Sequence, residues 1–331
     1  RGYAMRKLLL GTTALAAAAT ISANAALADV SISGSYEFKY LSRSSNDTAK
    51  DGTSFAHGDS EMIVNFSSKT DSGLALNYRY DIGAVGADGA GLTGDENSLS
   101  ISGGFGKIIL GIDDDASDSY NIDEMDLIAE EPTASTTDSS IRRNSATASS
   151  DAMKVAYHMP AMGGLTAGVS HTDSGANGTA DVTAMGAKYA MNAGGAAITL
   201  GYNTKTTENA TQDMDDSSMG VKIASGDLSV IISQGSYEAS DEDIESQGAS
   251  ISYKMPNGMT LGAFTFSSED DLDVGEEYSA SGAEVQYSIA SGLTAVITVI
   301  DYDYKVTAAN HEATPVADSG TMSQLTIKTS F

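Results

Sequence analysis

Large apolar side chains recur at every second position over most of this chain, which is the period of a β-strand with one hydrophobic face. Between residues 30 and 40, the even positions carry Val, Ile, Tyr or Phe with one Gly, and the odd positions carry Ser, Glu or Lys. Short glycine turns join such segments in pairs, because glycine supplies the positive φ that tight hairpins need. The turns fall at Thr70–Gly73, Gly103–Gly106, Pro160–Gly164, Asn192–Gly195, Ser225–Asp227, Pro256–Gly258 and Ala290–Gly292.

These seven turns predict fourteen strands, and a first strand plus a last strand at about 321–331 bring the expected total to sixteen. Both ends of the sheet then lie on the short-turn side, where the first and last strands can pair. Longer polar loops, such as residues 42–58, lie on the other side. This layout is typical of an outer-membrane barrel, and closure leaves no unpaired edge facing lipid. We therefore expect an all-β fold, a transmembrane antiparallel β-barrel with short periplasmic turns and long outer loops.

The charged residues support this fold, because they fall on the face opposite the large apolar residues. A lysine facing lipid at mid-membrane costs about 2–4 kcal/mol, whereas one facing a water-filled lumen does not. Nine basic residues share the polar face with five further ionisable residues: Lys39, Lys69, Arg79, Lys107, Lys154, Lys188, Lys222, Lys254 and Lys328, with Glu37, Glu61, Asp81, His158 and Glu284.

A soluble β-sandwich is the competing fold, since its strands also alternate, with apolar residues inward. The apolar faces here are thin and rich in tyrosine near the strand ends. They fit the aromatic girdles of a membrane barrel better than a packed core. Beyond the N-terminal leader no run of eighteen apolar residues occurs, so no membrane-spanning helix is expected.

The leader, residues 1–28, has the features of a secretory signal peptide. Residues 5–7 (Met-Arg-Lys) form a basic start, residues 8–19 are apolar, and residues 26–28 (Ala-Leu-Ala) form a small-residue cleavage site. Residues 23–25 (Ala-Asn-Ala) are a second candidate site, and residues 1–4 precede the expected start methionine. Export follows from this interpretation, and the predicted barrel then places the chain in a cell outer membrane.

The expected mature chain, residues 29–331, is a single domain with a strong negative charge. The whole chain carries a net charge of −27, and the leader contributes three basic residues and no acid, so the mature charge is −30. Nucleic acid is not an expected partner, because phosphate binding needs basic clusters. The chain has no cysteine, which excludes disulfides and thiolate metal sites.

The connection after residue 112 is the longest in the chain and is polar for about forty residues. A loop of this length inside a compact fold is usually functional or disordered. We expect this third loop to fold into the barrel and to narrow its lumen. Its acidic residues are Asp113, Asp114, Asp115, Asp118, Asp123, Glu124, Asp126, Glu130 and Glu131.

Four of these acids, Asp113, Asp114, Asp115 and Asp118, are candidate ligands for Ca²⁺, which takes six to eight oxygen ligands. Their spacing does not match an EF-hand, and a solvated charge run is the commoner meaning of such a cluster. No other cofactor is indicated. Catalysis is not expected, because no G-x-S-x-G motif is present. Ser170 and His171 are adjacent and would point to opposite faces of a strand.

The turn sequence at 102–111 (Ser-Gly-Gly-Phe-Gly-Lys-Ile-Ile-Leu-Gly), followed by an acidic loop, resembles the region before the third loop of Gram-negative general porins. Residues 153–168, the first strand and the terminal Phe331 also match, and the alphaproteobacterial type is the most similar. This resemblance implies a sixteen-stranded barrel that forms homotrimers, with loop acids facing basic residues on the wall. Carried over by position, the wall bases are Lys39, Arg79, Arg142, Arg143 and Lys154. Arg142 and Arg143 depart from the family pattern, because they lie at the end of the loop rather than in a strand.

The predicted function is a passive, weakly cation-selective diffusion channel for small hydrophilic solutes and ions. A substrate-specific channel and a non-conducting barrel, serving as adhesin or scaffold, are the alternatives. The expected partners are lipid, lipopolysaccharide and the outer-membrane assembly machinery, which would recognise Phe331. We expect a ring of basic residues at the periplasmic end of the pore and a negatively charged entrance at the outer end. The residues of this periplasmic rim are Lys69, Lys107, Lys188, Lys222, Lys254 and Lys328.

Overall fold

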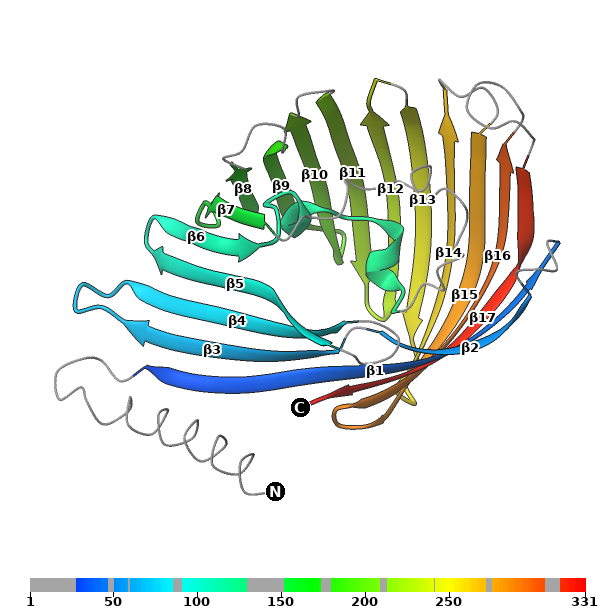
Figure 1. Ribbon diagram of the computed structural model, residues 1–331, viewed down its shortest axis with the longest axis horizontal. Coiled ribbons are helices and arrows are strands. Elements are labelled where there is room, and N and C mark those ends of the chain that lie inside the picture. Colours follow the sequence, from blue (N-terminus) through cyan, green and yellow to red (C-terminus); the bar gives the residue numbers. More distant parts are fainter. Residues whose placement is uncertain are drawn as a thin grey trace.

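The computed structural model describes residues 28–46, 51–58, 60–85, 91–129, 152–173, 180–208, 213–240, 242–271, 276–306 and 316–331. The predicted signal peptide, apart from Ala28, lies outside these residues. The described residues form one antiparallel sheet that closes on itself (Figure 1), where β1 (Asp29–Ser45) pairs with β17 (Val316–Ser330). The backbone N–H of Phe331 donates to the Gly34 carbonyl at 2.9 Å and completes the seam.

The other strands follow in chain order, and from β3 onward each pairs with its sequence neighbour. They are β2 (Gly52–His57), β3 (Glu61–Lys69), β4 (Ala75–Val85), β5 (Gly91–Gly103), β6 (Gly106–Asp113), β7 (Ala152–His158), β8 (Leu165–Thr172), β9 (Asp181–Ala193), β10 (Ala196–Glu208), β11 (Asp213–Ser225), β12 (Leu228–Glu238), β13 (Asp243–Lys254), β14 (Met259–Asp270), β15 (Glu276–Ala290) and β16 (Leu293–Val306). All seven predicted short turns are present between paired strands.

The predicted strand number is confirmed, with one correction in the first long loop. Both β2 and β3 pair with β1, β2 along residues 38–43 and β3 along residues 29–35. The two segments are therefore halves of one barrel strand, and the barrel has sixteen strands. The polar loop expected at 42–58 was too long, because residues 52–57 continue the sheet and β1 extends to Ser45.

The outer face of the barrel is apolar, which decides against the soluble sandwich. Ile32 and Ile232 are 64% and 63% exposed on this face, whereas a sandwich would bury such side chains. The cross-strand registers place the nine basic residues together on the inner face, as predicted. The inner face also holds an apolar cluster that the sequence did not predict. Its buried members on the strands are Phe264, Phe266, Tyr278, Ala280, Ile300, Tyr302, Tyr304 and Met322.

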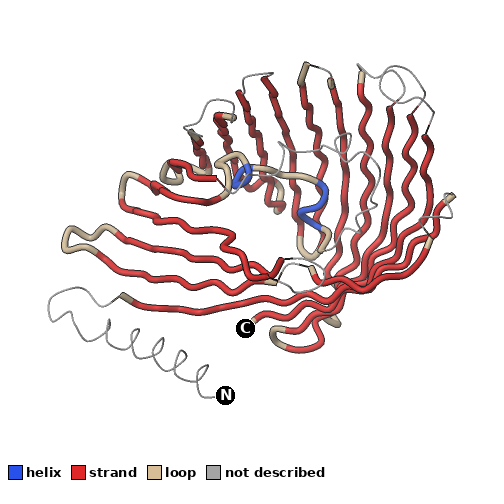
Figure 2. The backbone as a smooth tube through the Cα atoms, viewed as in Figure 1, coloured by secondary structure: helices blue, strands red, loops and turns tan. Residues whose placement is uncertain are grey.

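Two short 3-10 helices, η2 (Asp118–Tyr120) and η3 (Glu124–Leu127), lie inside the barrel on the connection between β6 and β7 (Figure 2). No helix in the described part of the chain is long and apolar enough to cross a bilayer. The interior position of the two helices confirms that the third loop folds into the lumen.

Candidate pore constriction

The third loop is fixed to the inner wall immediately after β6. Lys154 on β7 places its Nζ 2.9 Å from the Asp115 Oδ1, and the two side chains are 0% and 2% exposed. The next residue, Ala116, donates its backbone N–H to the Ser170 Oγ at 2.8 Å. The first anchor of the loop is therefore a buried ion pair with β7 and a hydrogen bond to β8.

The middle of the loop continues along the wall across β7 to β11. The Tyr120 hydroxyl lies 2.8 Å from the His158 Nδ1. The Asn121 Oδ1 accepts hydrogen bonds from the Asn203 Nδ2 at 3.2 Å and from the Ser218 Oγ at 2.9 Å. These contacts hold η2 against three separate strands.

The second helix is fixed by carboxylates at its start. The Met125 backbone N–H donates to the Asp123 Oδ1 at 2.9 Å, as in a normal helix cap. Glu124 is only 1% exposed, and its Oε2 accepts a hydrogen bond from the Ser233 Oγ at 2.9 Å. Glu124, one of the predicted loop acids, therefore faces the wall of β12.

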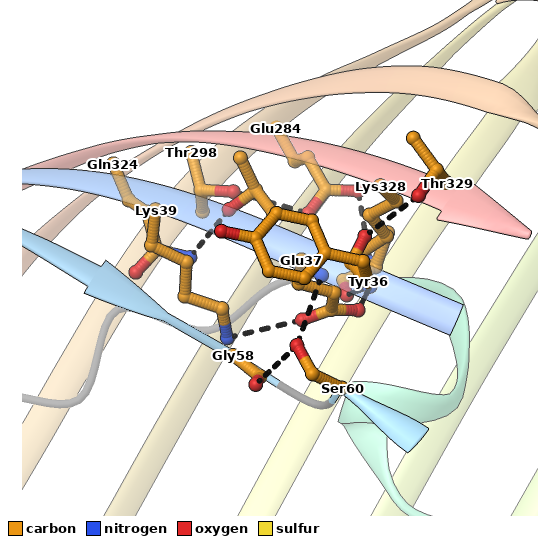
Figure 3. Close-up of polar contacts among 12 residues, drawn as sticks. Tyr36, Glu37, Lys39, Gly58, Ser60, Glu284, Thr298, Gln324, Lys328 and Thr329 are labelled. Atoms are coloured by element: carbon orange, nitrogen blue, oxygen red, sulfur yellow. Dashed lines mark hydrogen bonds and ion pairs between the residues drawn. The ribbon is translucent and has the colours of Figure 1, made fainter. Parts of the chain in front are cut away.

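The far end of the described loop meets the seam of the barrel. Ala129 donates its backbone N–H to the Glu284 Oε1 at 2.9 Å, and its carbonyl accepts from the Lys328 Nζ at 2.9 Å. The same Nζ lies 3.0 Å from a Glu37 carboxylate oxygen, and Lys39 approaches the other oxygen at 3.5 Å (Figure 3). One cluster thus joins the first strand, the last strand and the loop.

A row of glycines on the inner wall makes room for this path. A Cβ added to Gly220 would lie 2.0 Å from the Ile122 carbonyl oxygen, and one on Gly248 would lie 2.1 Å from the Glu124 Oε2. The loop therefore lies directly on the sheet, where any side chain would displace it. The loop-contacting glycines are Gly168, Gly186, Gly201, Gly220, Gly248 and Gly262, on β8, β9, β10, β11, β13 and β14. We call these six residues the glycine seat.

The glycine seat gives a direct test of loop placement. We expect Gly220→Ala to push the loop away from the wall, because the new methyl group meets backbone rather than a flexible side chain. Overpacking of this kind costs about 1–3 kcal/mol. Single-channel recording should show a less stable open current. Gly104→Ala is the matched control, since nothing lies within 4 Å of its added Cβ. If the open current is equally stable in the two variants, the glycine seat does not determine where the loop lies.

The loop carboxyls in the lumen have altered acidity. Desolvation by the surrounding loop and wall atoms raises the pKa of Asp118, Asp123 and Asp126 above the ordinary value for aspartate, although the side chains of Asp118 and Asp126 still contact solvent. At Asp118 the nearby carboxylates add to this rise. The ammonium groups of Lys188 and Lys222 act in the opposite direction at Asp126, without cancelling it.

The predicted wall bases do not form one array opposite the loop. Lys154 pairs with a loop acid, as the resemblance implied, but the pair is buried. The Arg79 NH2 and NH1 lie 2.6 Å from Asp81 and 2.8 Å from Glu96, which are both on the wall. Lys39 lies beside Glu37. Arg142, Arg143, Glu130 and Glu131 fall outside the described residues.

The predicted rim lysines are all inward-facing and lie toward the short-turn ends of their strands. Lys328 also holds the loop, so it is not only a rim residue. No three acidic or histidine side chains converge to hold a metal ion within the described ranges, and Asp115 of the predicted calcium set faces Lys154. The calcium site and the roles of the rim lysines stay predictions.

Two further bases on the inner wall were missed. Arg43 lies 2.5 Å from the Asp318 Oδ2 and donates its Nε–H to the Tyr302 hydroxyl at 2.9 Å. Lys205 is buried directly opposite Asp216. Arg43 shares the parity of Lys39, so extending the predicted first strand by three residues, from 40 to 43, would have found it.

A closed sixteen-stranded barrel with an apolar exterior, an ionisable interior and a loop seated in its lumen is the architecture of an outer-membrane channel. The family model for Gram-negative porins matches residues 11–312, and the chain belongs to that family. It is accordingly an outer-membrane porin. The narrower alphaproteobacterial assignment stays a prediction.

Solved structures of two porins and of one outer membrane protein share the fold at low sequence identity. The anion-selective porin from Comamonas acidovorans is 16% identical with a TM-score of 0.68, covering 92% of this chain and 100% of that one. OmpT of Vibrio cholerae, in its trimer form, is 14% identical with a TM-score of 0.69, at 92% and 99% coverage. A mutant of the Rh. blastica porin is 15% identical with a TM-score of 0.66, at 92% and 100% coverage. No curated protein sequence matches the chain.

Proposed function

We propose that this porin passes small hydrophilic solutes and ions by passive diffusion, with a weak preference for cations, and that it has no catalytic role. The observation that supports this most directly is the β6–β7 loop, which is fixed at both described ends and in the middle within the lumen. A loop held in this way narrows the lumen of the barrel but leaves it open to diffusion. Selection would then rest on pore width and on the charge of the lining.

The charge of the loop supports the cation preference. Residues 113–129 contain seven acids and no base. Asp114, Asp118 and Asp126 are exposed, so their charge acts on the solution in the lumen. An acidic lining raises the local concentration of cations. The anion-selective Comamonas acidovorans porin shares the fold but does not decide the sign here, because fold alone does not set the lining charge.

The test is the reversal potential of the purified porin in a planar bilayer under a salt gradient. We expect a cationic sign at neutral pH, and we expect the preference to weaken as the pH falls. The pKa values of Asp118, Asp123 and Asp126 are raised in the folded protein. These carboxyls therefore take up protons at a higher pH than exposed aspartates do, and the negative lining is lost first at the loop.

The variant Asp118→Asn/Asp126→Asn separates the loop from the remaining acids. It should show a smaller cation preference at neutral pH and a flatter pH dependence. High salt should weaken the preference of the parent, because the screening length falls from about 10 Å at 0.1 M to about 3 Å at 1 M. An anionic reversal potential at low salt would contradict the proposal.

Two alternatives give different currents in the same apparatus. A substrate-specific channel would show saturable block by its solute, and a non-conducting adhesin or scaffold would show no ion current. The proposal also includes a homotrimer, contact with lipid and lipopolysaccharide, and recognition of Phe331 by the assembly machinery. The trimer form of OmpT supports the first of these partners by analogy of fold.

A further inference from the structure

The described part of the third loop covers one side of the lumen and leaves another side open. The contacts of residues 115–129 given above all lie on strands from β7 to β17. Against the inner face of β3 to β6 there is a recess of about 390 Å³, which also reaches β1. A solute that passes the described part of the loop has this wall beside it.

The open wall is lined mainly by uncharged polar side chains. Ser33, Asn65, Asn77, Ser98 and Ser100 line the recess, and we call these five residues the serine–asparagine wall. They come from four strands and share one face. Asn77 lies opposite Ser100 across the β4–β5 pair, and its Nδ2 donates to the Asn65 Oδ1 at 3.2 Å. The wall is therefore continuous across neighbouring strands.

The charges around this wall are compensated or far apart. The guanidinium of Arg79, which also lines the recess, forms ion pairs with Asp81 and Glu96. Lys107 and Asp113 lie at opposite ends of β6 on the same face, with no ion-pair partner among the described residues. The two residues are six positions apart along the strand, or about 20 Å at the usual rise. A small zwitterion cannot reach both groups.

We propose that the serine–asparagine wall is a track for uncharged polyhydroxylated solutes, such as small sugars and polyols. Apart from the buried Ser98, the serine hydroxyls and asparagine amides of the wall can both donate and accept, which matches a solute whose hydroxyls do the same. Adjacent strands lie about 4.8 Å apart, so one solute can contact wall residues on two neighbouring strands at once. Ile63 and Ile109 add apolar surface for the C–H groups of a sugar ring. This track rests on the proposed function, since it needs an open lumen.

The experiment compares sugar permeation with ion conductance in one variant. Asn65→Leu/Asn77→Leu keeps the side chains near their original size and removes their hydrogen-bonding groups. We expect the swelling rate of porin-loaded liposomes in sucrose to fall about fivefold, as the loss of one or two hydrogen bonds predicts. Single-channel conductance in KCl should change little. The matched control is Asn97→Leu, because Asn97 is exposed and lies on the opposite parity from Ser98 of the wall.

The outcomes separate the two hypotheses. A parent protein that conducts no ions overturns both the proposed function and the track. A conducting parent whose sucrose permeation is the same in Asn65→Leu/Asn77→Leu and in Asn97→Leu overturns the track alone. An equal fall in sucrose permeation and in KCl conductance also overturns it, because that result indicates a narrower bore rather than lost hydrogen bonds.

Discussion

Deleting residues Asp118–Ser135 is expected to raise the single-channel conductance severalfold. The deletion removes η2, η3 and Ala129, and with them the contacts to Asn203, Ser233 and Glu284. Current through a water-filled pore is limited by its narrowest section, and we expect the loop to form that section. Planar-bilayer recording measures the change, and resistance of the variant to unfolding in detergent shows that the barrel itself is intact.

A second variant separates obstruction from charge. Asp118→Asn/Asp123→Asn/Asp126→Asn keeps the full length of the loop and removes three of its charges. It should alter selectivity while its conductance in concentrated salt stays near that of the parent. If the deletion variant folds and conducts like the parent, the loop is not the constriction.

The barrel itself followed from local patterns. Strict alternation fixes which face of each strand meets lipid, because a shift by one residue would expose lysines such as Lys188 to the membrane. The short turns were equally readable, since positions such as Gly258, with φ near +84°, need glycine. Reliance on local patterns also explains why residues 52–57 were predicted to be a loop. Serine, threonine and glycine hid a strand whose apolar marker, Phe55, was too isolated to reveal it.

The glycine seat could not be predicted from local sequence patterns. Gly220 and Gly248 lie in regular strands, and their meaning depends on which loop residue lies above them in three dimensions. The acids of the loop likewise look alike in sequence. Asp115 and Glu124 are buried against the wall, whereas Asp118 and Asp126 face solution. Only the path of the loop along β7 to β17 separates the two groups.

Lys154→Met is expected to release the first anchor of the loop. The substitution leaves the buried Asp115 carboxylate without the ammonium group that faces it at 2.9 Å. Breaking a buried pair by removing one partner costs about 3–5 kcal/mol. The loop can avoid much of this cost by moving Asp115 into the lumen, so we expect a noisier and larger open-channel current together with a lower unfolding temperature.

The double variant Lys154→Met/Asp115→Leu tests whether charge burial is the cause. Replacing a buried pair by apolar side chains of similar size is often neutral or stabilising. The double variant should therefore recover the steady current of the parent and most of its stability. Lys305→Met is the matched control, because its pair with Asp303 has the same kind of contact at 2.8 Å but is 54% and 41% exposed. An exposed pair contributes little, since water replaces the lost partner. If Lys154→Met proves as mild as Lys305→Met, or if the double variant is as noisy as the single one, the Asp115–Lys154 pair does not anchor the loop.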